Sequence, residues 1–136
     1  MIVYPYAALL ALFYVLLSVR TLRMRRQLRI PIGDAGNEAM LRAVRVHSNF
    51  AEYVPIALLL ILFAEQQGHA ALIIHALCLC LAGGRLSHAW GVRQLPEDHR
   101  YRVLGMALTF TAICSAALLL LAGSGGRRVA RPMQPD

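Results

Sequence analysis

Polar and charged side chains recur at helical spacing where a long apolar run begins, in the stretch RVHSNFAEYVP at residues 45–55. Arg45, Asn49 and Glu52 are four and then three residues apart, so a helix would place them on one face, with Arg42 one turn earlier. Together, an arginine, an amide and a carboxylate can bind a polar, charged ligand. The alternative is that they satisfy one another, with Glu52 pairing with Arg45 or with an arginine from a neighbouring helix.

More cationic side chains stand near the ends of two later apolar runs. Arg85 and His88 are three residues apart and would share a helix face. Arg100 and Arg102 stand near the start of the last run, where a positive charge opposes the helix macrodipole. Snorkelling toward lipid headgroups is the simpler alternative for either one. Because arginine forks suit carboxylates, the pattern predicts a pocket for an anionic, polar ligand near one membrane face.

Metal and covalent catalysis find no support in the sequence, which contains no HExxH, no GxSxG and no glycine-rich phosphate loop. Cys78 and Cys80 are two residues apart, so a helix would point them away from each other. With Cys114 they fall inside apolar runs, which is typical of small apolar filler. His75 stands alone in mid-run, where a packed or hydrogen-bonded histidine is expected. We therefore expect no metal site.

Four apolar runs must position these residues. Of the 136 residues, 58% are hydrophobic, and the mean hydropathy is +0.54, which exceeds what an ordinary soluble domain carries. Since a spanning helix needs roughly 20 mostly apolar residues, the sequence predicts an all-α, integral membrane four-helix bundle. We expect one domain at residues 1–122, with helices at about 2–28, 38–65, 70–92 and 98–122, followed by a disordered tail at 123–136.

Local signals add detail to these helices. Asn37 or Asp34 is placed to cap the second helix. Pro55 is expected to free a backbone carbonyl and to widen the bundle beside the polar face. Small residues that include Gly84 in the third run and Gly105 in the fourth recur at about four-residue spacing. This spacing predicts close approach between helices rather than chemistry.

The charge distribution predicts how the chain is oriented in the membrane. The net charge is +7, and every basic residue counted in that total is an arginine. The arginines cluster at the ends of apolar runs, which favours the positive-inside rule and anionic headgroups over a nucleic-acid partner. The first and third loops carry Arg20, Arg23, Arg25, Arg26, Arg29, Arg93, Arg100 and Arg102. We therefore expect a multi-pass protein, of the inner membrane if bacterial, with both loops and the site on the cytoplasmic side.

The pattern R-x-x-x-N-x-x-E-Y-x-P, formed by Arg45, Asn49, Glu52, Tyr53 and Pro55, resembles the MAPEG family, membrane-associated proteins in eicosanoid and glutathione metabolism. The chain looks like a bacterial-type member. The resemblance covers about residues 1–122 and extends to the GRLSH stretch and to the arginines that open the fourth helix. It implies homotrimers of four-helix subunits that bind glutathione between adjacent subunits near the cytosolic face.

The resemblance also implies a set of site residues. The glutathione contacts within one subunit would be Arg45, His47, Asn49, Glu52, Tyr53, Arg85 and His88. Arg25, Arg26 or Arg29 would reach in from the neighbouring subunit. The arginine that stabilises the glutathione thiolate would be Arg102 or, as the alternate, Arg100. A free thiol has a pKa of about 8.5, and a nearby fixed cation lowers it toward neutrality.

The function implied by the resemblance is that of a membrane-bound glutathione transferase or peroxidase acting on lipophilic electrophiles such as lipid hydroperoxides. Glutathione would be the co-substrate, and lipid the surrounding medium. Val92 replaces a tyrosine of several animal members, and Val103 replaces a serine of the prostaglandin-forming members, which argues against leukotriene or prostaglandin synthesis. The alternative is a non-catalytic binding, transport or scaffold protein whose polar belt only packs helices or binds another anionic ligand.

Overall fold

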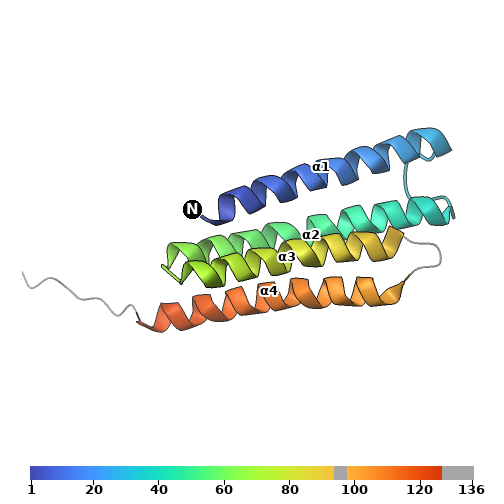
Figure 1. The fold of residues 1–136 in the computed structure, drawn as a ribbon. Coiled ribbons are helices and arrows are strands. Elements are labelled where there is room, and N and C mark those ends of the chain that lie inside the picture. Colours follow the sequence, from blue (N-terminus) through green and yellow to red (C-terminus); the bar gives the residue numbers. More distant parts are fainter. Residues whose placement is uncertain (94–97, 127–136) are drawn as a thin grey trace, which may run out of the picture.

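Four long helices form the bundle. The computed structural model describes residues 1–93 and 98–126, and its elements are α1 (Val3–Leu28), α2 (Glu38–Gln66), α3 (Ala71–Arg93) and α4 (His99–Gly126). They lie side by side and alternate in direction, so that the end of α1, the start of α2, the end of α3 and the start of α4 share one end of the bundle, here called the arginine-rich end (Figure 1). All four are long and apolar enough to cross a membrane. The predicted all-α, four-helix membrane bundle is confirmed.

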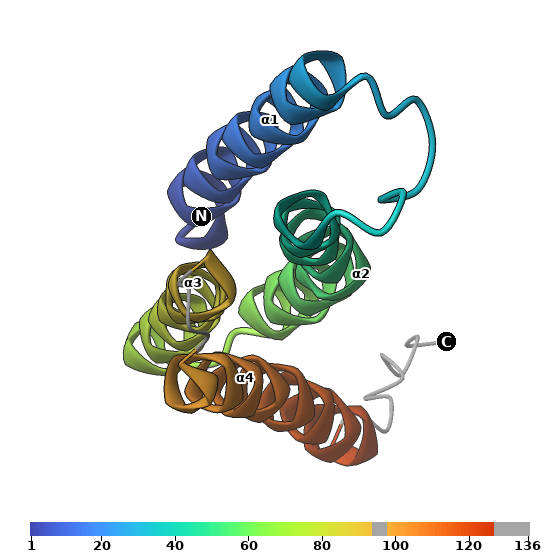
Figure 2. The same cartoon turned by 90° about the vertical axis from the view of Figure 1, so that its right-hand side faces the viewer.

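The packing places α1 to one side. It contacts α2 and α3 but does not contact α4 within the described residues, as the turned view shows (Figure 2). Large apolar side chains point away from the bundle, among them Leu12 and Leu16 on α1 and Leu118 and Leu121 on α4, each more than half exposed. Exposed apolar faces of this size are typical of surfaces that meet lipid or another subunit.

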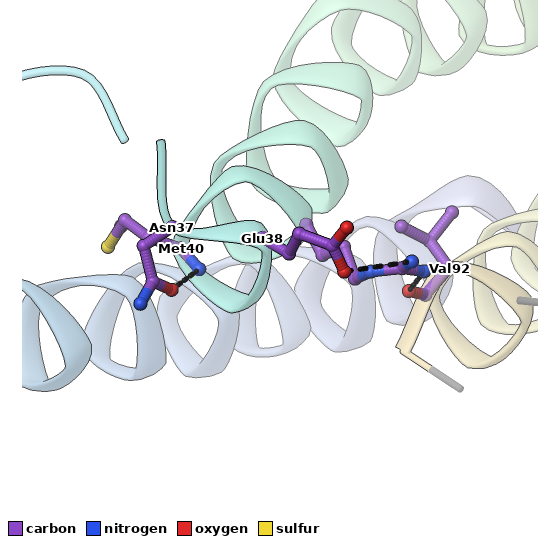
Figure 3. Close-up of polar contacts among 5 residues, drawn as sticks. Asn37, Glu38, Met40 and Val92 are labelled. Atoms are coloured by element: carbon purple, nitrogen blue, oxygen red, sulfur yellow. Dashed lines mark hydrogen bonds and ion pairs between the residues drawn. The ribbon is translucent and has the colours of Figure 1, made fainter. Parts of the chain in front are cut away.

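Local chemistry explains where the helices begin and end. Asn37 caps α2, because its side-chain oxygen accepts a hydrogen bond from the backbone N–H of Met40 at 3.0 Å (Figure 3). The helix then continues through Pro55. After α1, Arg29 and Gly33 adopt positive φ angles of 54° and 69°, which lets the chain turn back toward α2.

The last helix extends beyond its predicted end. The bounds of α1, α2 and α3 differ from the expected ones by one residue, but α4 reaches Gly126 rather than residue 122. Glycine disfavours a helix by about 1 kcal/mol per residue. In lipid, however, a backbone that leaves the helix loses its internal hydrogen bonds, which favours continuation. The rest of the predicted disordered tail, residues 127–136, lies outside the described residues.

Glycines hold α3 against α4. A Cβ atom added to Gly105 would lie 2.6 Å from both the carbonyl oxygen of Gly84 and the backbone nitrogen of His88, so no larger residue fits there without a shift. The close approach expected from the small-residue spacing is confirmed. It brings the Arg85–His88 segment of α3 directly against the first turns of α4.

The opposite end of the bundle is tied together by polar contacts. The Glu65 carboxylate accepts hydrogen bonds from the backbone N–H groups of Ile2 and Val3, the latter at 3.1 Å. It thereby caps the start of α1. Nearby, the Tyr6 hydroxyl lies 2.9 Å from Nδ1 of His75, so the hydrogen-bonded role expected for this histidine is confirmed. These contacts hold α1 to α2 and α3 far from the arginine-rich end.

Candidate functional site

A cavity of about 420 Å³ opens between α2, α3 and α4 at the arginine-rich end. Its wall consists of Glu38, Leu41, Arg42, Arg45, Ser48, Asn49 and Glu52 from α2, His88 and Val92 from α3, and Arg102 from α4. Known ligand cavities span roughly 300–1,000 Å³, so the size suits a small polar molecule. The cavity thus joins polar side chains from three helices.

One face of α2 supplies most of the wall. Arg45, Asn49 and Glu52 all line the cavity, as their four-then-three spacing predicts. Within residues 1–93 and 98–126, neither Arg45 nor Glu52 forms an ion pair, so the mutual Arg45–Glu52 pairing considered as the alternative is not formed. Both side chains are exposed to the cavity or its mouth. Their charges are therefore available to a ligand.

Arg42 strengthens the basic character of the wall. Its guanidinium lies 3.9 Å from the Glu38 carboxylate and donates a hydrogen bond to the Val92 carbonyl at 3.5 Å (Figure 3). The Glu38 side chain is 79% exposed, so this ion pair is screened by water and weak. The described wall residues include three arginines and two carboxylates. The described part of the wall therefore carries more positive than negative charge.

Arg85 lies directly behind this wall. Its side chain is buried, with 2% of the residue exposed. It donates hydrogen bonds to Asn49 Oδ1 and Thr109 Oγ1, each at 2.6 Å, and its guanidinium carbon lies 5.8 Å from the centre of the Tyr53 ring. No carboxylate pairs with it among the described residues. Arg85 therefore links α2, α3 and α4 through neutral partners and adds an uncompensated charge next to the cavity.

The contact with Arg85 fixes the orientation of Asn49. A guanidinium can only donate hydrogen bonds, so the side-chain atom of Asn49 that faces it must be the oxygen. The amide nitrogen of Asn49, which can only donate, is left for the cavity that the residue lines. Asn49 is thereby set to bind an acceptor such as a carboxylate or a peptide carbonyl. Arg85 is not among the wall residues and contacts the wall through Asn49.

Several residues expected at the site lie elsewhere in a single chain. His47 packs toward α1: its Nε2 is 3.0 Å from Ser18 Oγ, and its ring stacks on Tyr14 at 4.9 Å. Two residues along a helix turn it to the opposite face from Arg45. Tyr53 packs edge-on against Phe110, with ring centres 5.5 Å apart.

The basic residues near the chain turns also lie off the cavity wall. Arg25 donates to the Gly33 carbonyl at 2.8 Å and closes the turn after α1, while Arg26 and Arg29 are exposed. Arg100 is exposed as well and is not part of the wall, whereas Arg102 is. Of the two arginines proposed for thiolate stabilisation, Arg102 is thus the one placed beside Asn49 and His88.

Sequence reasoning left some wall residues out of the site. Glu38 and Ser48 belong to the wall beside Arg42, which its spacing from Arg45 already places on this face. Glu38 stands one further turn back on the same helical spacing as Arg42 and Arg45, so the same inference would have reached it. Thr109, which stands one turn after Gly105 on α4, holds Arg85. Its role depends on how α4 docks on α3, which spacing does not reveal.

Four apolar helices with a basic cavity at one end define an integral, multi-pass membrane protein. Comparison with known proteins narrows this class to one family. The sequence profile of the MAPEG family matches residues 3–122, and the chain belongs to this family. It is 37% identical over 117 residues to the inner membrane protein YecN of Escherichia coli K12, and it matches YecN of E. coli O6:H1 equally, with 86% of each chain covered. No solved structure gives a significant match. The name of this relative states a membrane location and no activity.

Proposed function

We propose that the cavity binds glutathione and that the protein is a glutathione transferase or peroxidase acting on lipophilic electrophiles. The observation that carries this proposal is the set of charges in one cavity: Arg42, Arg45 and Arg102 beside Glu52 and the donor amide of Asn49. Glutathione has two carboxylates, one ammonium group and a thiol. Arginines suit the carboxylates, and Glu52 suits the ammonium. Membership of the MAPEG family, whose members act in glutathione metabolism, supports the same ligand.

The chemistry needs little beyond binding and charge. Arg102 stabilises the thiolate, which is the nucleophilic form of glutathione. In the transferase reaction, sulfur attacks an electrophilic carbon, a C–S bond forms, and the leaving group departs with its electron pair. In the peroxidase reaction, the thiolate attacks a hydroperoxide oxygen and releases an alcohol. A second glutathione then converts the resulting sulfenic acid to glutathione disulfide and water. The apolar substrate enters from the bilayer.

The same proposal accounts for residues that lie off the cavity of a single chain. We place the cavity at the cytoplasmic face, because the arginines at the end of α1, the end of α3 and the start of α4 lie at this end of the bundle. A homotrimer would let His47 and the arginines at positions 25, 26 and 29 meet a ligand held by the adjacent subunit.

Activity in a bilayer tests the proposed reaction. The purified protein, reconstituted in liposomes, is expected to conjugate glutathione to a model aryl halide or to reduce a lipid hydroperoxide at the expense of glutathione. The rate should saturate with glutathione concentration. If the protein binds glutathione saturably but neither conjugates the aryl halide nor reduces the hydroperoxide, it is a glutathione-binding protein and not a transferase or peroxidase.

Asn49→Asp should weaken glutathione binding without lowering the stability of the protein. Aspartate keeps the acceptor for Arg85 and forms an ion pair with it, so we expect unchanged or higher stability. The donor toward the ligand is lost and a negative charge replaces it, so glutathione affinity should fall by at least about tenfold, as expected for one charge-assisted contact. Titration and thermal unfolding in detergent measure the two effects.

Asn49→Ala is the matched variant. It removes both the donor for the ligand and the acceptor for Arg85, so both affinity and stability should fall. If Asn49→Asp binds glutathione as tightly as the wild type, Asn49 does not donate to the ligand.

A further inference from the structure

A second, smaller basic cavity lies on the other side of α2. It has a volume of about 160 Å³ and lies between α1, α2 and α3. Its lining consists of Arg20 and Met24 from α1, Ala39, Arg42 and Val46 from α2, and Arg93 from α3. Three of these residues are arginines, and none of the described residues that line the cavity is acidic. Only Arg42 is shared with the proposed glutathione cavity.

Two arginines of this cavity, Arg20 and Arg93, bring like charges together, whereas Arg42 is paired with Glu38. Arg20 and Arg93 are close enough for their positive charges to repel each other. Within residues 1–93 and 98–126, neither side chain forms a hydrogen bond or an ion pair. Arg20 is partly buried, whereas Arg93 is exposed at the end of α3. Two positive charges held this close repel each other, and an anion bound between them would relieve that repulsion.

We propose that Arg20, Arg42 and Arg93 form a binding site for a phosphate group, separate from the glutathione cavity. Guanidinium groups bind phosphate oxygens through paired N–H donors, and three of them converge here from three helices. The volume is about five times the roughly 30 Å³ that one liquid water occupies. That is enough for a phosphate group with some of its water.

A groove with an apolar end adjoins this site along α1. It is lined by Leu16, Val19, Arg20, Arg23, Met24 and Gln27 and shares Arg20 and Met24 with the arginine cavity. Leu16 is 66% exposed and stands one turn before Arg20, on the side of the bilayer centre. The groove therefore passes from apolar to basic along the helix. This order suits an amphiphile whose phosphate lies among the arginines and whose hydrocarbon chain follows α1.

Two sources can supply the phosphate: the headgroup of an anionic phospholipid or free inorganic phosphate. Native mass spectrometry of the purified protein with added phosphatidylglycerol or phosphatidylcholine tests the first source. The change in melting temperature on adding inorganic phosphate tests the second.

The test variant combines Arg20→Gln with Arg93→Gln, which leaves Arg42 and the glutathione cavity unchanged. Arg26→Gln combined with Arg100→Gln removes the same charge from exposed positions at the same end of the bundle.

We expect the wild type and the Arg26/Arg100 variant to retain phosphatidylglycerol at least about tenfold better than the Arg20/Arg93 variant. If inorganic phosphate raises the melting temperature of the wild type and of the Arg26/Arg100 variant but not that of the Arg20/Arg93 variant, the site binds free phosphate. Equal phosphatidylglycerol retention together with equal phosphate shifts in all three proteins, or equal losses in both variants, would overturn the proposal. Lysine at positions 20 and 93 keeps the charge and should restore binding, which separates a lost site from a misfolded protein.

Discussion

Replacing Arg102 with glutamine is expected to lower the rate of glutathione conjugation at neutral pH by about ten- to a hundredfold. Arg102 lines the cavity beside Asn49 and His88. Without its charge, the bound thiol should return toward its ordinary pKa of about 8.5, and little thiolate forms at neutral pH. As the pH rises through that value, the variant should gain thiolate and the rate gap should narrow. Initial rates of aryl halide conjugation between neutral and alkaline pH measure this.

Arg100→Gln distinguishes the two candidate arginines. It removes the same charge two residues earlier, from an exposed side chain that is not part of the cavity wall. We therefore expect it to keep most of the wild-type rate at neutral pH. A large loss in Arg100→Gln together with a normal rate in Arg102→Gln would transfer the role to Arg100. A rate gap that does not change with pH would mean that Arg102 acts on binding and not on the thiol.

The largest effect on stability is expected at Arg85. Arg85→Ala should lower the free energy of unfolding by about 3 kcal/mol, because it opens a cavity and leaves Asn49 Oδ1 and Thr109 Oγ1 without their donor. Relief from burying a charge offsets part of this loss. Arg85→Lys keeps the charge but lacks the fork that reaches both oxygens at once, so it should restore stability only in part. Thermal unfolding in detergent, followed by circular dichroism, compares the variants.

Leu86→Ala is the control for this series, since Leu86 follows Arg85 on α3 and is 57% exposed. Its stability should stay close to that of the wild type. If Arg85→Ala proved as stable as Leu86→Ala, Arg85 would not hold the three helices together. Its hydrogen bonds would then serve only to orient the wall of the cavity.

The features that follow from local chemistry could be predicted from the sequence. The apolar runs determine the four helices, and Asn37 marks the start of α2 because its side chain satisfies an otherwise unpaired N–H. The face formed by Arg45, Asn49 and Glu52 follows from the helical period alone. These predictions succeed because each depends on residues within a few turns of one helix.

The features that depend on how helices dock could not be predicted. Spacing places Arg85 on a face of α3, but its burial depends on the close approach of Gly84 to Gly105. Whether Arg100 or Arg102 lines the cavity depends on how α4 is rotated against α3. Glu65 at the end of α2 caps the start of α1 across 62 intervening residues. The helical period carries no information about contacts this distant.

Equilibrium titration of glutathione into the purified, detergent-solubilised protein tests the central claim most directly. We predict saturable binding at neutral pH that is accompanied by the ultraviolet absorbance of a thiolate, with the signal reduced in Asn49→Asp and absent when the thiol of the peptide is methylated. If the folded protein gives no saturable signal across the glutathione concentrations at which known transferases saturate, the cavity does not bind glutathione and the proposed function is wrong.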